Sequence, residues 1–253
     1  MMSKQTRSWI FGLIIVSWCY GVAHSDAQHI GDILIGRDAD NRLIAVNVPG
    51  EKEIECLAPV SPNPFVSGYQ STKTGFDHLG GLADPNDSFP LASGVDIYVK
   101  LIDAEPGFHV VRLSPLAHLD TPGEMLRLGG ITQIHQHWSW NFNTNPALGP
   151  TIPDGFQGRM KATLSFVDQG STDYAESEPF TMVFSIDPNS PADVNGNGVV
   201  STPDAFALAA RWLDEDCAHP DWCGRADINL DGRVDWIDYS WIIDFWLSTQ
   251  GCP

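Results

Sequence analysis

The stretch Asp193-Val-Asn-Gly-Asn-Gly-Val-Val-Ser-Thr-Pro-Asp204 returns 34 positions later, from residue 204 to residue 238, as Asp227-Ile-Asn-Leu-Asp-Gly-Arg-Val-Asp-Trp-Ile-Asp238. Both copies place oxygen-bearing side chains at positions 1, 3, 5 and 12, glycine at position 6 and valine at position 8. Twelve residues wrapped around a glycine turn can supply the roughly six to eight oxygens that a hard cation such as calcium binds. We therefore expect two cation-binding loops, joined to each other through their valines as a short strand pair.

Each loop continues into a segment that we expect to be helical, residues 205–213 and residues 239–247. Two loop–helix units of this kind resemble a dockerin of the first type, the calcium-dependent docking module of secreted bacterial proteins. The resemblance covers roughly the last quarter of the chain. It implies two bound calcium ions, and a cohesin-like or other cell-surface protein as the partner.

The family pattern also implies which residues bind calcium. The ligands of loop 1 are Asp193, Asn195, Asn197, the carbonyl of Val199, and Asp204. Those of loop 2 are Asp227, Asn229, Asp231, the carbonyl of Arg233, and Asp238, with Asp235 acting through a water. Calcium affinity increases with the number of carboxylates. Because loop 2 contains more acids than loop 1, we expect it to bind calcium more tightly.

The module departs from the family in ways that concern its partner. Family members that dock to cohesins often carry small hydroxyl residues at positions 10 and 11, where this chain has Thr202-Pro203 and Trp236-Ile237. The second helical segment also carries four large apolar side chains. We expect this face either to pack on the rest of the protein or to bind a protein partner, because exposed apolar patches tend to mark such surfaces. Its members are Trp241, Ile242, Phe245 and Trp246.

The N-terminus has the features of a bacterial secretory signal. Lys4 and Arg7 precede an apolar run that ends in small residues, with cleavage after Ala23 or Ala27. No later stretch reaches the ~20 apolar residues of a transmembrane helix. We therefore expect a secreted protein, extracellular or attached to a cell surface. Its expected divisions are a signal at 1–27, a β-domain at 28–187, a linker at 188–191 and the calcium module at 192–253.

The cysteines are consistent with export, because an exported protein reaches an oxidising compartment in which disulfides persist. Cys217 and Cys223 are close enough in sequence to form a disulfide in the turn between the calcium units. Cys56 and Cys252 are then left, either to bridge the two domains or to stay unpaired. The formal net charge of −18 argues against nucleic acid as a partner, since phosphate binding needs clustered Lys and Arg.

Residues 28–187 contain many segments with the alternating pattern of strands and no long amphipathic helix, which favours an antiparallel β-sandwich. We expect one hairpin over 31–46 and a second over 95–113. Short strands are expected within residues 47–93, and an irregular connection at 114–130. Three further strands are expected at 131–142, 159–168 and 180–187. The core faces of the last two are Met160, Ala162, Leu164 and Phe166, and Phe180, Met182, Phe184 and Ile186.

The segment Ile134-His-Gln-His-Trp-Ser-Trp-Asn-Phe142 is expected to form a single strand with the aromatic residues on its buried face. His135, His137, Ser139 and Asn141 would then share the polar face. Histidines at i and i+2 of a strand can bind one metal ion, with zinc the first candidate and copper the second. His29 and Asp32 are the first candidates for further ligands. The alternative is that both histidines simply lie on a solvated strand face.

The run from His135 through His137 to Trp140 is also similar to a motif in a β-domain of secreted, surface-anchored bacterial proteins, some of which are associated with zinc acquisition. Two functions follow. The first is a non-catalytic β-sandwich that binds a ligand or a metal and is attached through the calcium module. The second is a polysaccharide-degrading enzyme or carbohydrate-binding component attached in the same way. The available carboxylates show no spacing that singles out a catalytic pair; they are Glu124, Asp173, Glu176 and Glu178.

Overall fold

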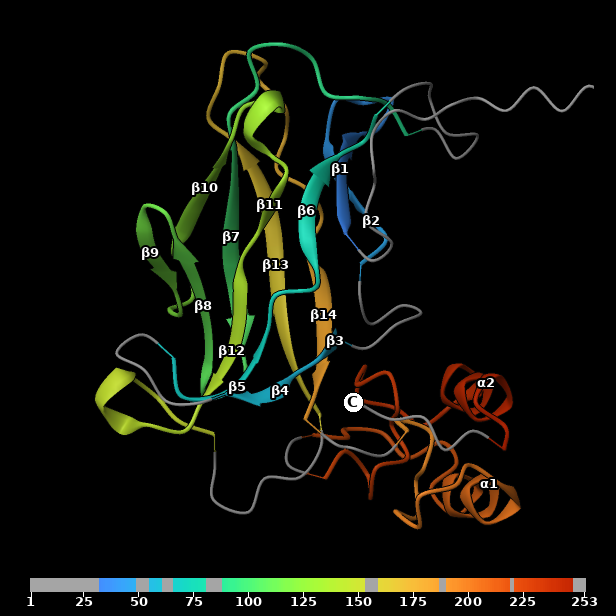
Figure 1. Cartoon of the computed structure of the whole chain (residues 1–253). Coiled ribbons are helices and arrows are strands. Elements are labelled where there is room, and N and C mark those ends of the chain that lie inside the picture. Colours follow the sequence, from blue (N-terminus) through green and yellow to red (C-terminus); the bar gives the residue numbers. More distant parts are fainter. Residues whose placement is uncertain are drawn as a thin grey trace, which may run out of the picture.

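The computed structural model describes residues 32–48, 55–60, 66–80, 88–152, 159–186, 190–218 and 221–247 (Figure 1). The expected signal, His29, Cys252 and the first part of the expected linker lie outside these residues. The strands of the described residues form three sheets, and nearly all neighbours pair antiparallel. The exceptions are two parallel pairs, β1 with β6 and β3 with β14.

We name each sheet after one of its strands. The β13 sheet has the order β10 (Met125–Gly129), β7 (Ile97–Ala104), β13 (Arg159–Asp168), β14 (Phe180–Ser185) and β3 (Glu55–Cys56). The β12 sheet has the order β4 (Ala58–Val60), β5 (Gly68–Ser71), β12 (Ser139–Asn143), β8 (Phe108–Leu113) and β9 (Leu116–Leu119). The β1 sheet has the order β11 (Gln136–His137), β6 (Gly75–His78), β1 (Ile33–Arg37) and β2 (Leu43–Val46). Two short 3-10 helices, η1 (Ile131–Gln133) and η2 (Pro146–Leu148), lie in the connections.

The hydrophobic core lies between the β13 sheet and the other two sheets. Phe166 of β13 contacts Phe76 of the β1 sheet, with ring centroids 6.0 Å apart. Phe184 of β14 lies 5.7 Å from the ring of Trp140 in the β12 sheet. Aromatic side chains therefore join the β1 sheet and the β12 sheet to the β13 sheet, and the N-terminal part is a mostly β sandwich as expected. The predicted core residues Met160, Ala162, Leu164, Phe166, Met182 and Phe184 are buried, and Phe180 and Ile186 are partly buried.

The hairpin predicted over residues 95–113 is wrong in its pairing. β7 pairs with β10 and β13, whereas β8 pairs with β9 and β12. The turn at Gly107, which has φ of +91°, carries the chain from one layer of the sandwich to the other. Both strands have alternating apolar residues, so the sequence pattern could not distinguish a hairpin from a crossing between layers. The connection expected to be irregular at 114–130 contains β9 and β10.

The single strand predicted over residues 131–142 is also wrong. The chain forms η1, then β11 and β12, which belong to different sheets. Trp138 lies between the two strands and is buried, as are Trp140 and Phe142, so the predicted aromatic face is confirmed. The polar face is divided, because Ser139 and Asn141 are buried within the β12 sheet and only the histidines stay on the β1 sheet.

The C-terminal module contains α1 (Thr202–Ala209) and α2 (Trp236–Asp244), which lie on its side away from the strands (Figure 1). Both helices begin three residues earlier than predicted, and they end four (α1) and three (α2) residues earlier. Position 9 of each loop is the N-cap, and the carboxylate at position 12 accepts a hydrogen bond from the N-cap N–H. These bonds join Ser201 to Asp204 and Asp235 to Asp238, each at 2.8 Å. Neither helix has the length and apolar character needed to span a membrane, and the same holds for the rest of the described chain.

Candidate functional site

Loop 1 is folded around two buried carboxylates. Asp193 accepts hydrogen bonds from the N–H groups of Asn197 at 3.0 Å and Gly198 at 2.7 Å. Asp204 accepts from the N–H of Asn195 at 3.1 Å and from its side-chain amide at 2.7 Å. Both carboxylates are 0% exposed, whereas Asn195 and Asn197 lie at the surface. Positions 1 and 12 therefore form the inner wall of the loop, and positions 3 and 5 its outer wall.

Loop 2 repeats this arrangement. Asp227 accepts from the N–H groups of Asp231 at 3.2 Å and Gly232 at 2.9 Å. Asp238 accepts from the N–H of Ile228 at 2.6 Å and from that of Asn229 at 3.2 Å. Both carboxylates are again 0% exposed. Asp235, expected to act on calcium through a water, accepts a hydrogen bond from the N–H of Ile237 at 2.7 Å and thereby caps α2.

The charges in loop 2 fit a cation site. The pKa of Asp227 is raised to about 7, mainly by burial and also by the carboxylates of Asp238 and Asp231, against the lowering effect of Gly232 N–H and of Arg159. Burial also raises the pKa of Asp238. Buried carboxylates packed this closely are unfavourable as anions, and a calcium ion between them would remove the repulsion. The donor set of both loops is made of oxygens, as calcium requires.

The pairing of the two loops differs from the prediction. Val200 and Val234 at position 8 are both fully buried, but their carbonyls accept hydrogen bonds from the segments that follow the helices. Val234 accepts from Leu213 N–H at 2.9 Å, and Val200 from Leu247 N–H at 2.8 Å. Each loop is thus held by the residue that ends the helical unit of the other repeat. The residues responsible lie outside the repeated 12 positions, so the loop pattern alone could not reveal them.

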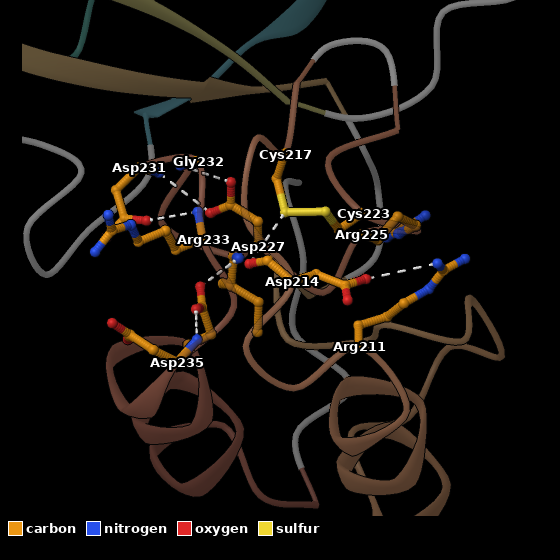
Figure 2. Close-up of a disulfide and its surroundings, with 12 residues drawn as sticks. Arg211, Asp214, Cys217, Cys223, Arg225, Asp227, Asp231, Gly232, Arg233 and Asp235 are labelled. Carbon is orange, nitrogen blue, oxygen red and sulfur yellow. Dashed lines mark hydrogen bonds and ion pairs between the residues drawn. A yellow bond between two sulfur atoms is a disulfide. The ribbon is translucent and has the colours of Figure 1, made fainter.

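The segment between the repeats supports loop 2. Cys217 and Cys223 form a disulfide with Cα atoms 5.1 Å apart (Figure 2). The N–H of Cys217 donates to the carbonyl of Gly232 at 3.0 Å, and the N–H of Val234 donates to the carbonyl of Asp214 at 3.0 Å. The cysteine-containing segment therefore lies along the second half of loop 2 and fixes its glycine turn.

The β-sandwich contacts the other half of loop 2. Arg159, at the start of β13, donates hydrogen bonds to the carbonyls of Ile228 at 2.5 Å and Arg225 at 3.1 Å. Lys161 donates to the carbonyl of Leu230 at 2.9 Å, and its ammonium lies 4.7 Å from the ring centroid of Trp222. Leu230 and Trp222 are buried with Val183 of β14. Loop 2 is consequently held from two sides, by its own module and by the β-sandwich.

The predicted partner surface on α2 needs correction. Trp241 and Ile242 are buried in the core of the module, and Phe245 is partly buried and stacks on Trp241 with centroids 5.8 Å apart. Of the four residues, only Trp246 is exposed. The most exposed apolar side chain of α2 is instead Trp236 at its start, at 72%. One face of α2 points toward the core of the module. Which residues lie on that face depends on where the helix begins, and the prediction placed its start three residues too late.

The structure brings some of the residues of the predicted histidine site close together. His137 Nε2 lies 3.8 Å from Asp32 Oδ2, and the His135 and His137 rings are 5.7 Å apart. His29 lies outside the described residues. Asp77 of β6 was not anticipated, although its Oδ2 is 3.3 Å from His135 Nδ1. It belongs to residues 47–93, where the weak periodicity gave no strand register.

The residues considered for polysaccharide chemistry have structural contacts. Glu176 accepts hydrogen bonds from Lys100 at 3.0 Å and from the hydroxyl of Ser165 at 2.6 Å. Glu178 forms an ion pair with Arg42, and Glu124 accepts from backbone N–H groups of its own turn. Trp138 and Trp140 are buried, so they offer no flat surface to a sugar ring.

Comparison with known proteins agrees with the geometry of the C-terminal module. Residues 191–246 match the family model described as the dockerin type I domain. No curated protein and no solved structure matches the chain. The module is therefore dockerin type I-like, which means a calcium-binding module that suggests docking to a cohesin-type partner.

Proposed function

We propose that this protein is exported and uses its C-terminal module, in the calcium-bound form, to attach a β-sandwich to a cohesin-type protein. The observation that carries the proposal is the family match over residues 191–246, together with four buried carboxylates at positions 1 and 12 of two repeated loops. The proposed divisions are a signal at 1–27, the β-sandwich at 28–187, a linker at 188–191 and the module at 192–253. The Cys217–Cys223 disulfide supports an oxidising destination.

Each loop is proposed to hold one calcium ion. Asp193, Asn195, Asn197 and Asp204 would supply side-chain oxygens in loop 1, together with the carbonyl of Val199. Asp227, Asn229, Asp231 and Asp238 would do so in loop 2, together with the carbonyl of Arg233. The hydrogen bonds from loop amides to the four buried carboxylates support this assignment, because they preorganise the oxygens around one point.

The partner is proposed to contact the start of α2. Trp236 is 72% exposed and Ile237 is 51% exposed, at the positions where cohesin-binding relatives often carry hydroxyl residues. The Trp236 ring is held edge-on between Trp212, at 5.1 Å, and Tyr239, at 5.7 Å. A rigid, exposed aromatic side chain loses little entropy on binding. We expect a partner surface that is more apolar than one that recognises hydroxyl groups.

Capture by immobilised cohesin domains tests the proposal. The full mature chain is applied to a panel of such domains, once with calcium and once with a calcium chelator. At least one domain is expected to retain the wild type only with calcium. Trp236→Ala is expected to weaken capture by about 2 kcal/mol, or roughly 30-fold, as for a central aromatic contact.

Leu113→Ala is the matched control, because Leu113 is an equally exposed apolar residue on β8 in the β-sandwich. It should bind like the wild type. Failure of every cohesin domain to retain calcium-loaded, folded protein would reject docking of this kind. Capture that persists in chelator would reject its calcium dependence.

A further inference from the structure

Two aspartates and two histidines come together on the β1 sheet, far in sequence from the calcium loops. In the register of this sheet His137 of β11 is opposite Gly75 of β6, and Ile33 of β1 is level with Phe76. Asp32, one residue before Ile33, is therefore level with Gly75 on its other side. His135 and Asp77 lie two positions farther along their strands, beyond the row of Gln136, Phe76 and Ile33, and so on the same face of the sheet. Three neighbouring strands thus bring the four side chains to one place.

The two carboxylates are fixed in similar ways. Asp32 Oδ1 accepts a hydrogen bond from Gly75 N–H at 2.9 Å, and Asp77 Oδ1 accepts from His78 N–H at 2.7 Å. Each Oδ2 is then turned into the cluster. Asp32 is 1% exposed, and its Oδ2 has no hydrogen-bond partner within the described structure. A buried carboxylate oxygen left in this state is costly, which indicates a missing cation.

The orientation of the His137 ring also indicates a missing cation. Its Nδ1 lies 3.1 Å from the carbonyl oxygen of Thr72, which can only accept, so Nδ1 carries the proton. Nε2 of the neutral ring then directs a lone pair toward Asp32 Oδ2 at 3.8 Å. Two acceptors face each other favourably only if a metal ion lies between them or if the ring gains a second proton. A ligating histidine that donates its other N–H to a backbone carbonyl is the usual arrangement at metal sites.

Gly75 gives the ring its room. A Cβ at this position would lie 2.9 Å from both Cε1 and Nδ1 of His137 and 2.7 Å from the carbonyl oxygen of Gln136. The absence of a side chain on β6 therefore lets the imidazole lie across that strand toward Asp32. Because φ of Gly75 is not in the left-handed region, backbone conformation does not demand glycine here. The close approach of His137 does.

We propose that Asp32, Asp77, His135 and His137 bind one divalent transition-metal ion, with zinc as the first candidate. One ligand atom from each of Asp32, Asp77 and His135 lies within 4.8 Å of the others. Tetrahedral zinc with bonds of about 2.0–2.2 Å places its ligands about 3.4 Å apart. His135 and Asp77 already lie 3.3 Å apart, whereas His137, 3.8 Å from Asp32, stands outside the group of three and has to approach it when the metal binds. Imidazole nitrogens favour such an ion over calcium or magnesium.

Access and charge balance support the site. The His135 side chain is 50% exposed, so the cluster is open to solvent on that side. Among the described residues the ion pairs of Asp32 and Asp77 are all with histidines, so no permanently charged side chain neutralises the two carboxylates. This site is independent of the proposed docking function, because it uses residues of the β-sandwich alone.

Zinc binding by the full mature chain tests the proposal. Calcium is kept in excess to occupy the loops, zinc chloride is titrated against a competing chelator, and bound zinc is counted by elemental analysis after dialysis. One zinc ion per chain is expected. Removing a residue that only hydrogen-bonds to a metal ligand costs about 10–100-fold in metal affinity. His137→Gln and His135→Gln each remove a ligand itself, so each is expected to lower zinc affinity at least about 100-fold.

Both histidine side chains are partly exposed, at 31% and 50%, so these variants should keep the fold, which circular dichroism and tryptophan fluorescence verify. His118→Gln is the control, because His118 is an exposed histidine on β9 in another sheet. Cobalt in place of zinc should give the visible absorption of a tetrahedral site, and His137→Gln should abolish it. A folded wild type that holds no zinc, or variants that bind zinc as the wild type does, would overturn the proposal.

Discussion

Arg159, the first residue of β13, donates a hydrogen bond to the carbonyl oxygen of Ile228 at 2.5 Å and thereby connects the β-sandwich to the second position of calcium loop 2. The arginine is 4% exposed, and its other terminal nitrogen donates to the carbonyl of Arg225. Loop 1 has no counterpart of this contact in the described chain. The two repeats are alike in sequence, but among the described residues only loop 2 is bonded to the β-sandwich.

Removal of this contact should loosen the module. Arg159→Met retains much of the apolar stem but leaves two buried carbonyls without their donor. Lost hydrogen bonds to charged groups cost about 2 kcal/mol each, so with two bonds lost the free energy of unfolding of the module should fall by about 4 kcal/mol. Differential scanning calorimetry with calcium present should show the module of Arg159→Met unfolding at a lower temperature than that of the wild type. Arg211→Met is the control, because Arg211 forms only an exposed ion pair with Asp214 (Figure 2). Equal melting of both variants would contradict the role of Arg159.

The two loops should differ in calcium affinity because of the residue at position 5, and exchanging that residue should change the affinity of each loop. Position 5 is Asn197 in loop 1 and Asp231 in loop 2, and both are exposed. Affinity follows the number of carboxylates, so Asp231→Asn should weaken loop 2 by about tenfold and Asn197→Asp should strengthen loop 1 by about tenfold. Isothermal titration calorimetry of the single and double variants measures both steps. If Asp231→Asn altered only the weaker step, the assignment of the tighter site to loop 2 would be wrong.

The Cys217–Cys223 disulfide should stabilise loop 2 from the side opposite Arg159. The sequence separation is 6 residues, and closing so short a loop is worth about 2 kcal/mol in the chain-entropy model. Replacing both cysteines with serine should lower the melting temperature of the module and weaken calcium binding at loop 2 more than at loop 1. The comparison of calorimetric titrations before and after the double replacement checks this, and equal losses at both loops would argue against a local effect.

The pH dependence of the β-sandwich should depend in part on Asp168. Burial acts to raise its pKa, but hydrogen bonds from the N–H of Asp96, the hydroxyl of Thr172 and the N–H groups of Gly170 and Tyr174 outweigh this and lower the pKa from 3.8. A carboxylate with a lowered folded-state pKa stabilises the fold above its unfolded pKa, and this stability is lost as pH falls through the folded value.

Asp168→Asn should therefore lower the free energy of unfolding by about 2 kcal/mol at neutral pH and reduce the further loss below pH 3.8. Urea titrations at neutral and acidic pH measure the difference. Asp40→Asn, at an exposed carboxylate in the turn between β1 and β2, is the control for replacing an aspartate by asparagine. An unaltered profile for Asp168→Asn would show that its hydrogen bonds contribute little.

The sequence by itself determined the elements whose pattern is local. The twofold loop motif identified the module, because calcium ligands come from positions close together on one short turn. Alternation along residues 159–168 and 180–187 predicted both strands and the faces that they bury, since neighbouring side chains in a strand point to opposite sides; the second strand ends two residues earlier, at Ser185.

Only the tertiary structure decided which strands are neighbours and which loops are supported. The strands β7 and β8 are adjacent in sequence yet lie in different sheets. The apolar face of a strand can be buried in either sheet of a sandwich, so the sequence pattern does not decide between them. Asp77 joins His135 only through the register of β6, and Arg159 reaches Ile228 across a sequence separation of 69 residues. Contacts of this kind depend on where the chain folds back on itself, and local residue patterns carry no information about that.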